Sequence, residues 1–149
     1  MSVGEYCIRD VVITDRDTSI LEAAKLMRRH HVGSLIIVDK KKGLNIPVGI
    51  LTDRDIVVEL LADDVDLEKI SIGDAMSDNL VTATEEDEVM ETIEKMRGWG
   101  VRRVPVIDHE GAIVGLLAVD DMIELIAEQM NNLAKLVSIE RLREQGRRK

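Results

Sequence analysis

The chain contains an internal repeat, and this repeat restricts its possible folds more strongly than any other feature. Residues 3–39 match residues 72–108 at a constant offset of 69 positions. The matched pairs include Val12 with Val81, Glu22 with Glu91, Met27 with Met96 and Asp39 with Asp108. Beyond Asp39 the offset falls to 66, because nine residues (40–48) stand opposite six (109–114). The sequence therefore predicts two copies of one structural unit that differ in the length of a hairpin loop.

Each copy is predicted to contain the elements β-α-β-β-α. In the first copy, apolar runs and helical periodicity predict strands at 11–14, 34–38 and 47–52 and helices at 19–31 and 53–62. The pattern Ser19-x-x-Glu22 is typical of a capping box at a helix start. One such unit is too small to bury its own faces, so the two copies are expected to pack sheet against sheet about a pseudo-twofold axis. The predicted fold class is α/β, or α+β.

The predicted domain organisation follows the repeat. It consists of a first repeat at 3–62, an acidic linker at 63–71, a second repeat at 72–128 and a C-terminal helical extension at 129–149. Helical apolar periodicity continues through the extension to about Arg143. The apolar side of this long helix needs a cover, which is either the module itself or a second chain. The basic tail is predicted to be a solvated end, because such a tail alone is weak evidence for nucleic-acid binding.

The composition argues against several function classes. The net charge of −9 repels the phosphates of nucleic acids and anionic membranes over most of the surface. Aromatic residues are limited to Tyr6 and Trp99, which leaves no stacking platform for single-stranded nucleic acid. The lone Cys7 has no partner for an internal disulfide, no secretory signal pattern is present, and no apolar run approaches the ~18 residues that span a bilayer. We therefore expect a soluble, cytoplasmic protein, in which a small anionic ligand would need a locally positive pocket.

The stretch Gly49-Ile-Leu-Thr-Asp-Arg-Asp-Ile56 is the strongest candidate for a binding site. An apolar strand ends there at a helix start, where unpaired backbone N–H groups and the helix dipole favour a phosphate or a hydroxyl-rich ligand. A capped helix without a ligand is the simpler alternative, with Thr52 or Asp53 as the N-cap and Asp55 near the positive end of the dipole. Residues 115–122 repeat the pattern in a weaker form.

Together these motifs resemble a tandem pair of cystathionine-beta-synthase (CBS) domains over roughly residues 3 to 128. The resemblance is carried by the openings 3–7 and 72–76, the segment Val101-Arg-Arg-Val-Pro-Val-Ile-Asp108, and the stretches 49–56 and 115–122. It implies two β-α-β-β-α units in pseudo-twofold contact, which in this family commonly dimerise into a flat disc. It also implies clefts between the sheets that bind AMP, ADP, ATP or S-adenosylmethionine, and a role as a sensor.

The resemblance assigns roles to individual residues. Thr52 would contact the phosphate side of the ligand, and Asp55 would accept hydrogen bonds from the ribose hydroxyls. Asp121 would bind ribose in the second copy, and Arg103, next to Arg102, matches the phosphate-binding basic position. The remaining candidate site residues are Gly33, Ser34, Asp53, Arg54, Pro105, Thr14, and Thr82 or alternatively Thr84. The threonines lie at the strand ends that, by the resemblance, line the adenine and ribose.

The two copies depart from the family pattern in complementary ways. The first copy has Gly33-Ser34 where the second has Arg102-Arg103, and the second copy has Ala118 in place of Thr52. Neither copy therefore carries the complete set of binding residues. Arg54 is expected to supply positive charge near the first copy, so the site there is the one expected to be occupied.

The leading functional hypothesis is a non-catalytic regulatory module that senses AMP, ADP or ATP. The alternatives are a sensor of S-adenosylmethionine or another adenosyl ligand, a ligand-independent dimeric scaffold with vestigial pockets, and a nucleotide-hydrolysing enzyme. Catalysis is not expected, because Cys7 and the serines have no His at a recognisable family spacing. No metal site or required cofactor is expected, since the adjacent His30 and His31 point in different directions. The expected partners are the nucleotide, a second copy of the chain and a regulated protein, with neither nucleic acid nor membrane as a main partner.

Overall fold

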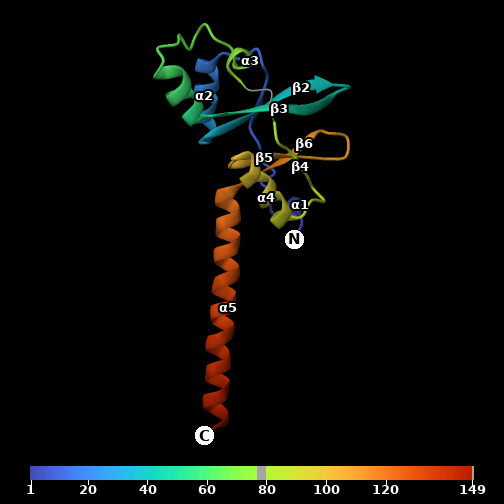
Figure 1. Cartoon of the computed structure of the whole chain (residues 1–149), viewed down its shortest axis with the longest axis vertical. Helices are drawn as coiled ribbons and strands as arrows, with labels where there is room; N and C mark the ends of the chain where they lie inside the picture. The colour runs from blue at the N-terminus through green and yellow to red at the C-terminus, as the bar shows by residue number, and fades with distance from the viewer. Residues whose placement is uncertain (77–79, 149) are drawn as a thin grey trace.

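The computed structural model describes residues 1–76 and 80–148, which form two small α/β units and a long C-terminal helix (Figure 1). In chain order the elements are α1 (Val3–Tyr6), β1 (Ile13–Thr14), α2 (Ile20–His30), β2 (Ser34–Lys41), β3 (Leu44–Thr52), the π-helix η1 (Asp55–Leu61), α3 (Ile72–Ala75), β4 (Ala83–Thr84), α4 (Val89–Trp99), β5 (Arg103–Ile107), β6 (Ile113–Ala118) and α5 (Val119–Arg147). The predicted order β-α-β-β-α is therefore confirmed in both copies.

The two sheets have the same topology. In the order β1-β2-β3, the short β1 runs parallel to β2, and β2 pairs antiparallel with β3. The sheet β4-β5-β6 repeats this arrangement. The two sheets meet where β3 contacts β6, which agrees with the predicted packing of one repeat on the other.

Each sheet has its own aliphatic core, as expected for a chain with so few aromatic residues. The core of the first unit joins α2 to its sheet through Ile20, Ala23, Leu35, Ile37 and Leu51. The core of the second unit joins α4 to its sheet through Val89, Met96, Val104, Val106 and Leu117. These side chains lie at helical spacing on the helices and on one face of the central strands, so the sequence pattern accounts for both cores.

The opening segments of the two copies are exchanged between the units. Val3 of α1 is buried in the core of the second unit, and Ile72 of α3 is buried in the core of the first. Matching hydrogen bonds fix the two segments: Val3 N–H donates to Asp87 O at 2.8 Å, and Ile72 N–H donates to Thr18 O at 2.8 Å. The two donors are related to each other by the offset of 69 found in the sequence, and so are the two acceptors. Neither unit completes its core without a segment from the other half of the repeat.

The linker 63–71 is held against the start of α2. The backbone N–H groups of Ile20 and Leu21 donate to Ile70 O and Leu67 O, each at 3.0 Å. These N–H groups lie in the first turn of a helix, where no intrahelical acceptor exists, so the linker satisfies them. The Ser19 hydroxyl accepts from Glu22 N–H, which confirms Ser19 as the N-cap, but among the described residues the Glu22 side chain does not return a bond to Ser19 N–H, so the predicted capping box is only half formed.

The hairpin of the first copy differs from the expectation. The three additional residues within 40–48 lengthen the strands instead of the loop, because β2 and β3 pair as far as Lys41 and Leu44. A two-residue turn closes the hairpin, with Lys42 at φ 53° and Gly43 at φ 79°. Two residues with positive φ are the geometry that matches the twist of paired strands. The sequence prediction was wrong here because it placed no turn at Lys42-Gly43.

The helix predicted at 53–62 is present, but its hydrogen bonding is of the π type over η1. Ala62 N–H donates to Val57 O at 3.0 Å, five residues earlier in the chain. The apolar spacing of so short a segment does not distinguish this pattern from an α-helix. Such turns occur frequently at functional sites, and η1 begins at the candidate corner.

Candidate functional site

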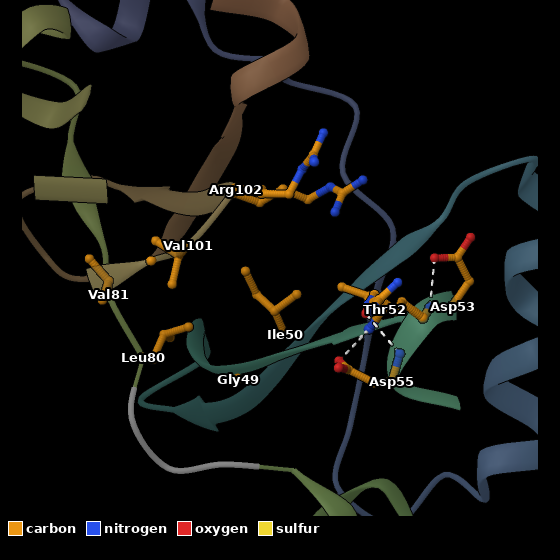
Figure 2. A pocket seen from close by; sticks show the side chains of 12 residues that line it. Gly49, Ile50, Thr52, Asp53, Asp55, Leu80, Val81, Val101 and Arg102 are labelled. Atoms are coloured by element: carbon orange, nitrogen blue, oxygen red, sulfur yellow. Dashed lines mark hydrogen bonds between the residues drawn. The ribbon is translucent and has the colours of Figure 1, made fainter. Parts of the chain in front are cut away.

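A cleft of about 510 Å³ lies between the two units, and both of them line it (Figure 2). The first unit contributes the end of β3 and the turn into η1, and the second contributes the segments that lead into β4 and β5. The lining residues are Gly49, Ile50, Thr52, Asp53, Arg54, Asp55, Leu80, Val81, Gly100, Val101, Arg102 and Arg103. The corner identified in the sequence therefore faces the basic pair of the second copy.

One part of the cleft is apolar. Figure 2 shows Leu80, Val81 and Val101 together on the side of the second unit, with Ile50 of β3 facing them. Three of these four side chains are branched at the β carbon, which restricts their χ1 rotation, so the wall is stiff. A flat apolar group of a ligand would lose its contact with water against this wall.

The other part of the cleft carries the polar groups of the corner. The Thr52 N–H donates to Asp55 Oδ2 at 3.0 Å, and the Asp55 N–H donates to Thr52 Oγ1 at 3.1 Å (Figure 2). This reciprocal pair has the form of a capping box, so the simpler alternative of a capped helix start describes the geometry correctly. Within residues 1–76 and 80–148, however, Asp55 Oδ1 accepts no hydrogen bond, so the carboxylate keeps one oxygen for another donor.

The cationic groups of the cleft come from both units. Arg102 forms an ion pair with Asp120 of α5, with 3.1 Å between Nη2 and Oδ1. The guanidinium groups of Arg54 and Arg103 form no hydrogen bond or ion pair with any residue that the structure describes. The lining thus contains three arginines and two aspartates, a formal balance of +1 in a chain of net charge −9. Asp120, which pairs with Arg102, offsets one of these charges, so Arg54 and Arg103 are the arginines of the lining that remain for an anionic ligand.

The corresponding corner of the second unit is incomplete. Ala118 occupies the N-cap of α5 and has no hydroxyl to donate or accept. Asp121 has a buried Oδ2 atom without a hydrogen-bond partner among the described residues. Burial raises the pKa of the Asp121 carboxyl, and the neighbouring Asp120 and Glu124 raise it further. The Ala118 N–H and the Arg103 guanidinium oppose the rise without cancelling it.

The structure brings half of the predicted site residues together in this cleft and places the others elsewhere. The six in the cleft are Thr52, Asp53, Arg54, Asp55, Arg102 and Arg103. Gly33 and Ser34 lie behind the corner, where Gly33 O accepts from Asp53 N–H at 2.9 Å and Ser34 pairs with Thr52 in the sheet.

The remaining predicted residues lie outside the lining of the cleft. Thr14 lines a separate depression of about 520 Å³ together with Asp39 and Asn45. Thr82 accepts a hydrogen bond from Lys95 Nζ through its carbonyl oxygen at 2.7 Å, next to the lining residue Val81. Pro105 is fully buried in β5.

The apolar wall was not predicted from the sequence. The predicted site residues include Thr82 but not Leu80 and Val81, and they include Arg102 and Arg103 but not Val101. Polar residues attract attention in a search for sites, whereas valine and leucine before a strand resemble ordinary core residues. The signal that was available is position, because all three precede the short strands that face the corner.

Residues 1–76 and 80–148 contain no cluster of three or more His, Cys, Asp or Glu side chains that could hold a metal ion. None of their helices combines the length and apolar character needed to cross a membrane.

Comparison with known proteins identifies the family. The model of the CBS domain matches residues 3–62 and again residues 72–128. These two matches cover most of the chain and coincide with the two copies of the repeat. The chain belongs to the CBS-domain family and carries a tandem pair of these domains.

Individual relatives resemble the chain over most of its length. An uncharacterised protein of Methanopyrus kandleri, MK0525, is 33% identical over 125 residues, which make up 84% of this chain and 62% of the relative. The chain thus spans less than two thirds of that protein.

Two solved structures share the fold and contain adenosyl ligands. The CBS domain pair of protein MJ0100, in complex with 5′-methylthioadenosine and S-adenosyl-L-methionine, aligns with a TM-score of 0.73 at 30% identity, over 85% of this chain and 99% of that one. The CBS domain protein PAE2072 of Pyrobaculum aerophilum, in complex with AMP, aligns with a TM-score of 0.72 at 26% identity, over 81% of this chain and 89% of that one.

Proposed function

We propose that this chain is a non-catalytic regulatory module that binds an adenine nucleotide of the AMP, ADP or ATP class in the cleft between its two repeats. The observation that carries the proposal is the composition of that cleft. It joins an apolar wall to a polar corner, and its guanidinium groups at Arg54 and Arg103 are unpaired within the described residues. The apolar wall suits a purine, the polar corner suits a ribose, and the guanidinium groups suit a phosphate.

Each part of a nucleotide has a counterpart in the cleft. The purine fits against Ile50, Val81 and Val101, where it is removed from water. The ribose diol donates to Asp55, whose Oδ1 is free of other described donors, in a charge-assisted hydrogen bond. The phosphate is bound by Arg103, with the positive end of the η1 dipole close by.

The charge of the cleft favours a nucleotide over a cationic adenosyl ligand. Arg54 and Arg103, which form no ion pair with a described residue, attract phosphate and repel the sulfonium of S-adenosylmethionine. The AMP complex of PAE2072 supports the nucleotide, while the complex of MJ0100 keeps S-adenosylmethionine as the alternative.

A ligand in this cleft would touch both repeats and could therefore change how they pack. Such a change requires only that the ligand bind one arrangement of the repeats better than another. The output would then pass to a second copy of the chain or to a regulated protein partner, with no reaction at the cleft and no required cofactor. We place this activity in the cytoplasm, in keeping with the lone cysteine.

A ligand-independent scaffold is the second candidate, and one observation favours it. Thr52 and Asp55 satisfy each other in the capping box without any ligand. The corner would therefore persist in a protein whose cleft had lost its binding role.

Isothermal titration with AMP, ATP and S-adenosylmethionine separates these candidates. The wild-type chain should bind AMP or ATP more tightly than S-adenosylmethionine. Asp55→Asn keeps an oxygen that accepts from the Thr52 N–H but removes the charge, so binding should weaken by about 10- to 150-fold, as expected for one hydrogen bond to a charged group. Arg29→Gln, on the exposed end of α2, is the control and should leave binding unchanged. Absence of binding by all three ligands at millimolar concentration would favour the scaffold, and steady nucleotide turnover would favour an enzyme.

A further inference from the structure

The helix α5 extends far beyond the two CBS units. Figure 1 shows it projecting away from both sheets as a single straight helix. Of its side chains only Met122 is buried, and every residue from Ile126 to Arg148 is exposed. The CBS domain match ends at residue 128, so most of this helix is not accounted for by the family fold. The sequence left open whether the module would cover the helix, and the structure shows that it does not.

A regular apolar stripe runs along the helix. It consists of Ile123, Ile126, Met130, Leu133 and Val137, which follow one another at intervals of three, four, three and four residues and are 47–66% exposed. At 3.6 residues per turn these side chains share one face of the helix. Intervals of three and four in alternation are the a and d positions of a heptad repeat, the seam of a coiled coil.

The charges of this segment lie away from the stripe. Glu124, Glu128 and Lys135 occupy the opposite side of the helix when they are placed at 100° per residue. The positions that flank the seam, which in many coiled coils carry the charges that select a partner, are uncharged here. They hold Ala127 and Ala134 on one side and Met122, Gln129 and Leu136 on the other. Two identical helices can therefore approach along this stripe without bringing like charges together.

We propose that α5 is a dimerisation helix, whose stripe from Ile123 to Val137 pairs with the same stripe of a second copy of this chain. A second copy is the occupant that this stripe fits, because a seam at heptad spacing is complementary to itself and its uncharged flanking positions bring no like charges together when two identical helices pair. The stripe is thus the surface through which a dimer forms. This proposal does not depend on whether the cleft binds a nucleotide.

Sedimentation equilibrium of the full chain tests the proposal. The wild-type chain should form dimers over a concentration series. The double variant Ile126→Gln/Leu133→Gln should raise the dissociation constant by about tenfold or more, because it replaces two seam side chains by polar ones of good helix propensity. Glu128→Gln/Lys135→Gln, on the opposite side of the same helix, is the matched control and should leave the constant unchanged. A monomeric wild-type chain would overturn the proposal, as would a dimer that the seam variant does not weaken.

Cysteine cross-linking provides a second readout that does not depend on destabilising the helix. In a Cys7→Ser background, Ile126→Cys/Met130→Cys should form a disulfide-linked dimer on mild oxidation, since each position meets its own counterpart in a parallel pair and position 126 meets position 130 in an antiparallel pair centred near residue 128. Glu128→Cys, between them in sequence but on the opposite face, should remain monomeric on a non-reducing gel. Equal cross-linking of both variants would show random collision and contradict the pairing. Circular dichroism checks that each variant keeps its helix content.

Discussion

Asp121 differs from its counterpart Asp55 in the surroundings of its carboxyl group. Each accepts a hydrogen bond from the N–H three residues earlier, that of Thr52 or that of Ala118, but Asp121 also has a buried Oδ2 without a partner among the described residues. Burial, followed by the charges of Asp120 and Glu124, raises the pKa of this carboxyl. The ionised form of Asp121 is therefore less stable in the folded chain than in the unfolded chain.

This raised pKa predicts a specific pH dependence. Because the folded state takes up the proton first, the contribution of Asp121 to the free energy of unfolding should increase as pH falls from neutral through the raised pKa, and level off below the ordinary aspartate value. Asp121→Asn removes this contribution. Urea unfolding of both proteins at several pH values should show the wild type gaining on the variant as pH falls. A difference that is independent of pH, or that reverses, would contradict the assignment.

The backbone at Gly115 is packed so closely that no side chain fits there. A Cβ at this position would lie 2.7 Å from Cys7 Sγ and 2.9 Å from Ile8 O, whereas a Cβ at Gly98 in α4 meets nothing within 4 Å. Gly115→Ala should therefore lower the free energy of unfolding by about 1–3 kcal/mol. Gly98→Ala should raise it by up to about 1 kcal/mol, because alanine favours a helix interior. Equal effects in thermal unfolding would mean that residues 7 and 8 do not pack on the second unit.

At the scale of the element, the two helix starts differ by one hydroxyl. Thr52 and Asp55 cap the first turn into η1 reciprocally, and α5 begins at Ala118 without a side-chain cap. Thr52→Val keeps the shape and removes the hydroxyl, so it should cost about 1 kcal/mol of stability. Ala118→Thr should stabilise the chain by about 0.5–1 kcal/mol, with Ala118→Val as its control. Chemical denaturation measures all three, and a valine that stabilises as much as threonine would show that packing, not capping, is responsible.

The sequence was sufficient for the repeat and for the order of elements, because both depend on local periodicity. The offset of 69 appears again in the hydrogen bonds that fix Val3 and Ile72. The exchange of these opening segments between the units was not predictable, since it depends on which core each segment reaches in three dimensions. The turn at Lys42-Gly43 was missed, and the π-type bonding of η1 leaves no mark in the apolar spacing.

At the scale of the whole molecule, the site depends on the meeting of two incomplete copies. Each copy taken alone lacks some of the nucleotide-binding residues of the family pattern. From the sequence, Arg54 was therefore expected to supply the positive charge for the first copy. In the folded chain, Arg102 and Arg103 of the second copy line the same cleft as Thr52 and Asp55 of the first. The departures of the two copies are thus complementary within one cleft. The repeat explains this result, since the pseudo-symmetric contact places the basic pair of one copy opposite the corner of the other.

Calorimetric titration of AMP into an arginine variant of the second copy tests this account most directly. Arg102→Gln/Arg103→Gln leaves the whole first copy intact, including Arg54, and Arg28→Gln/Arg29→Gln removes the same charge from the exposed end of α2 as a control. A site assembled from both repeats predicts one AMP per wild-type chain, binding weakened by about tenfold or more in the first variant, and no change in the control. Unchanged AMP binding by Arg102→Gln/Arg103→Gln would contradict the account, because the first copy would then bind the nucleotide alone.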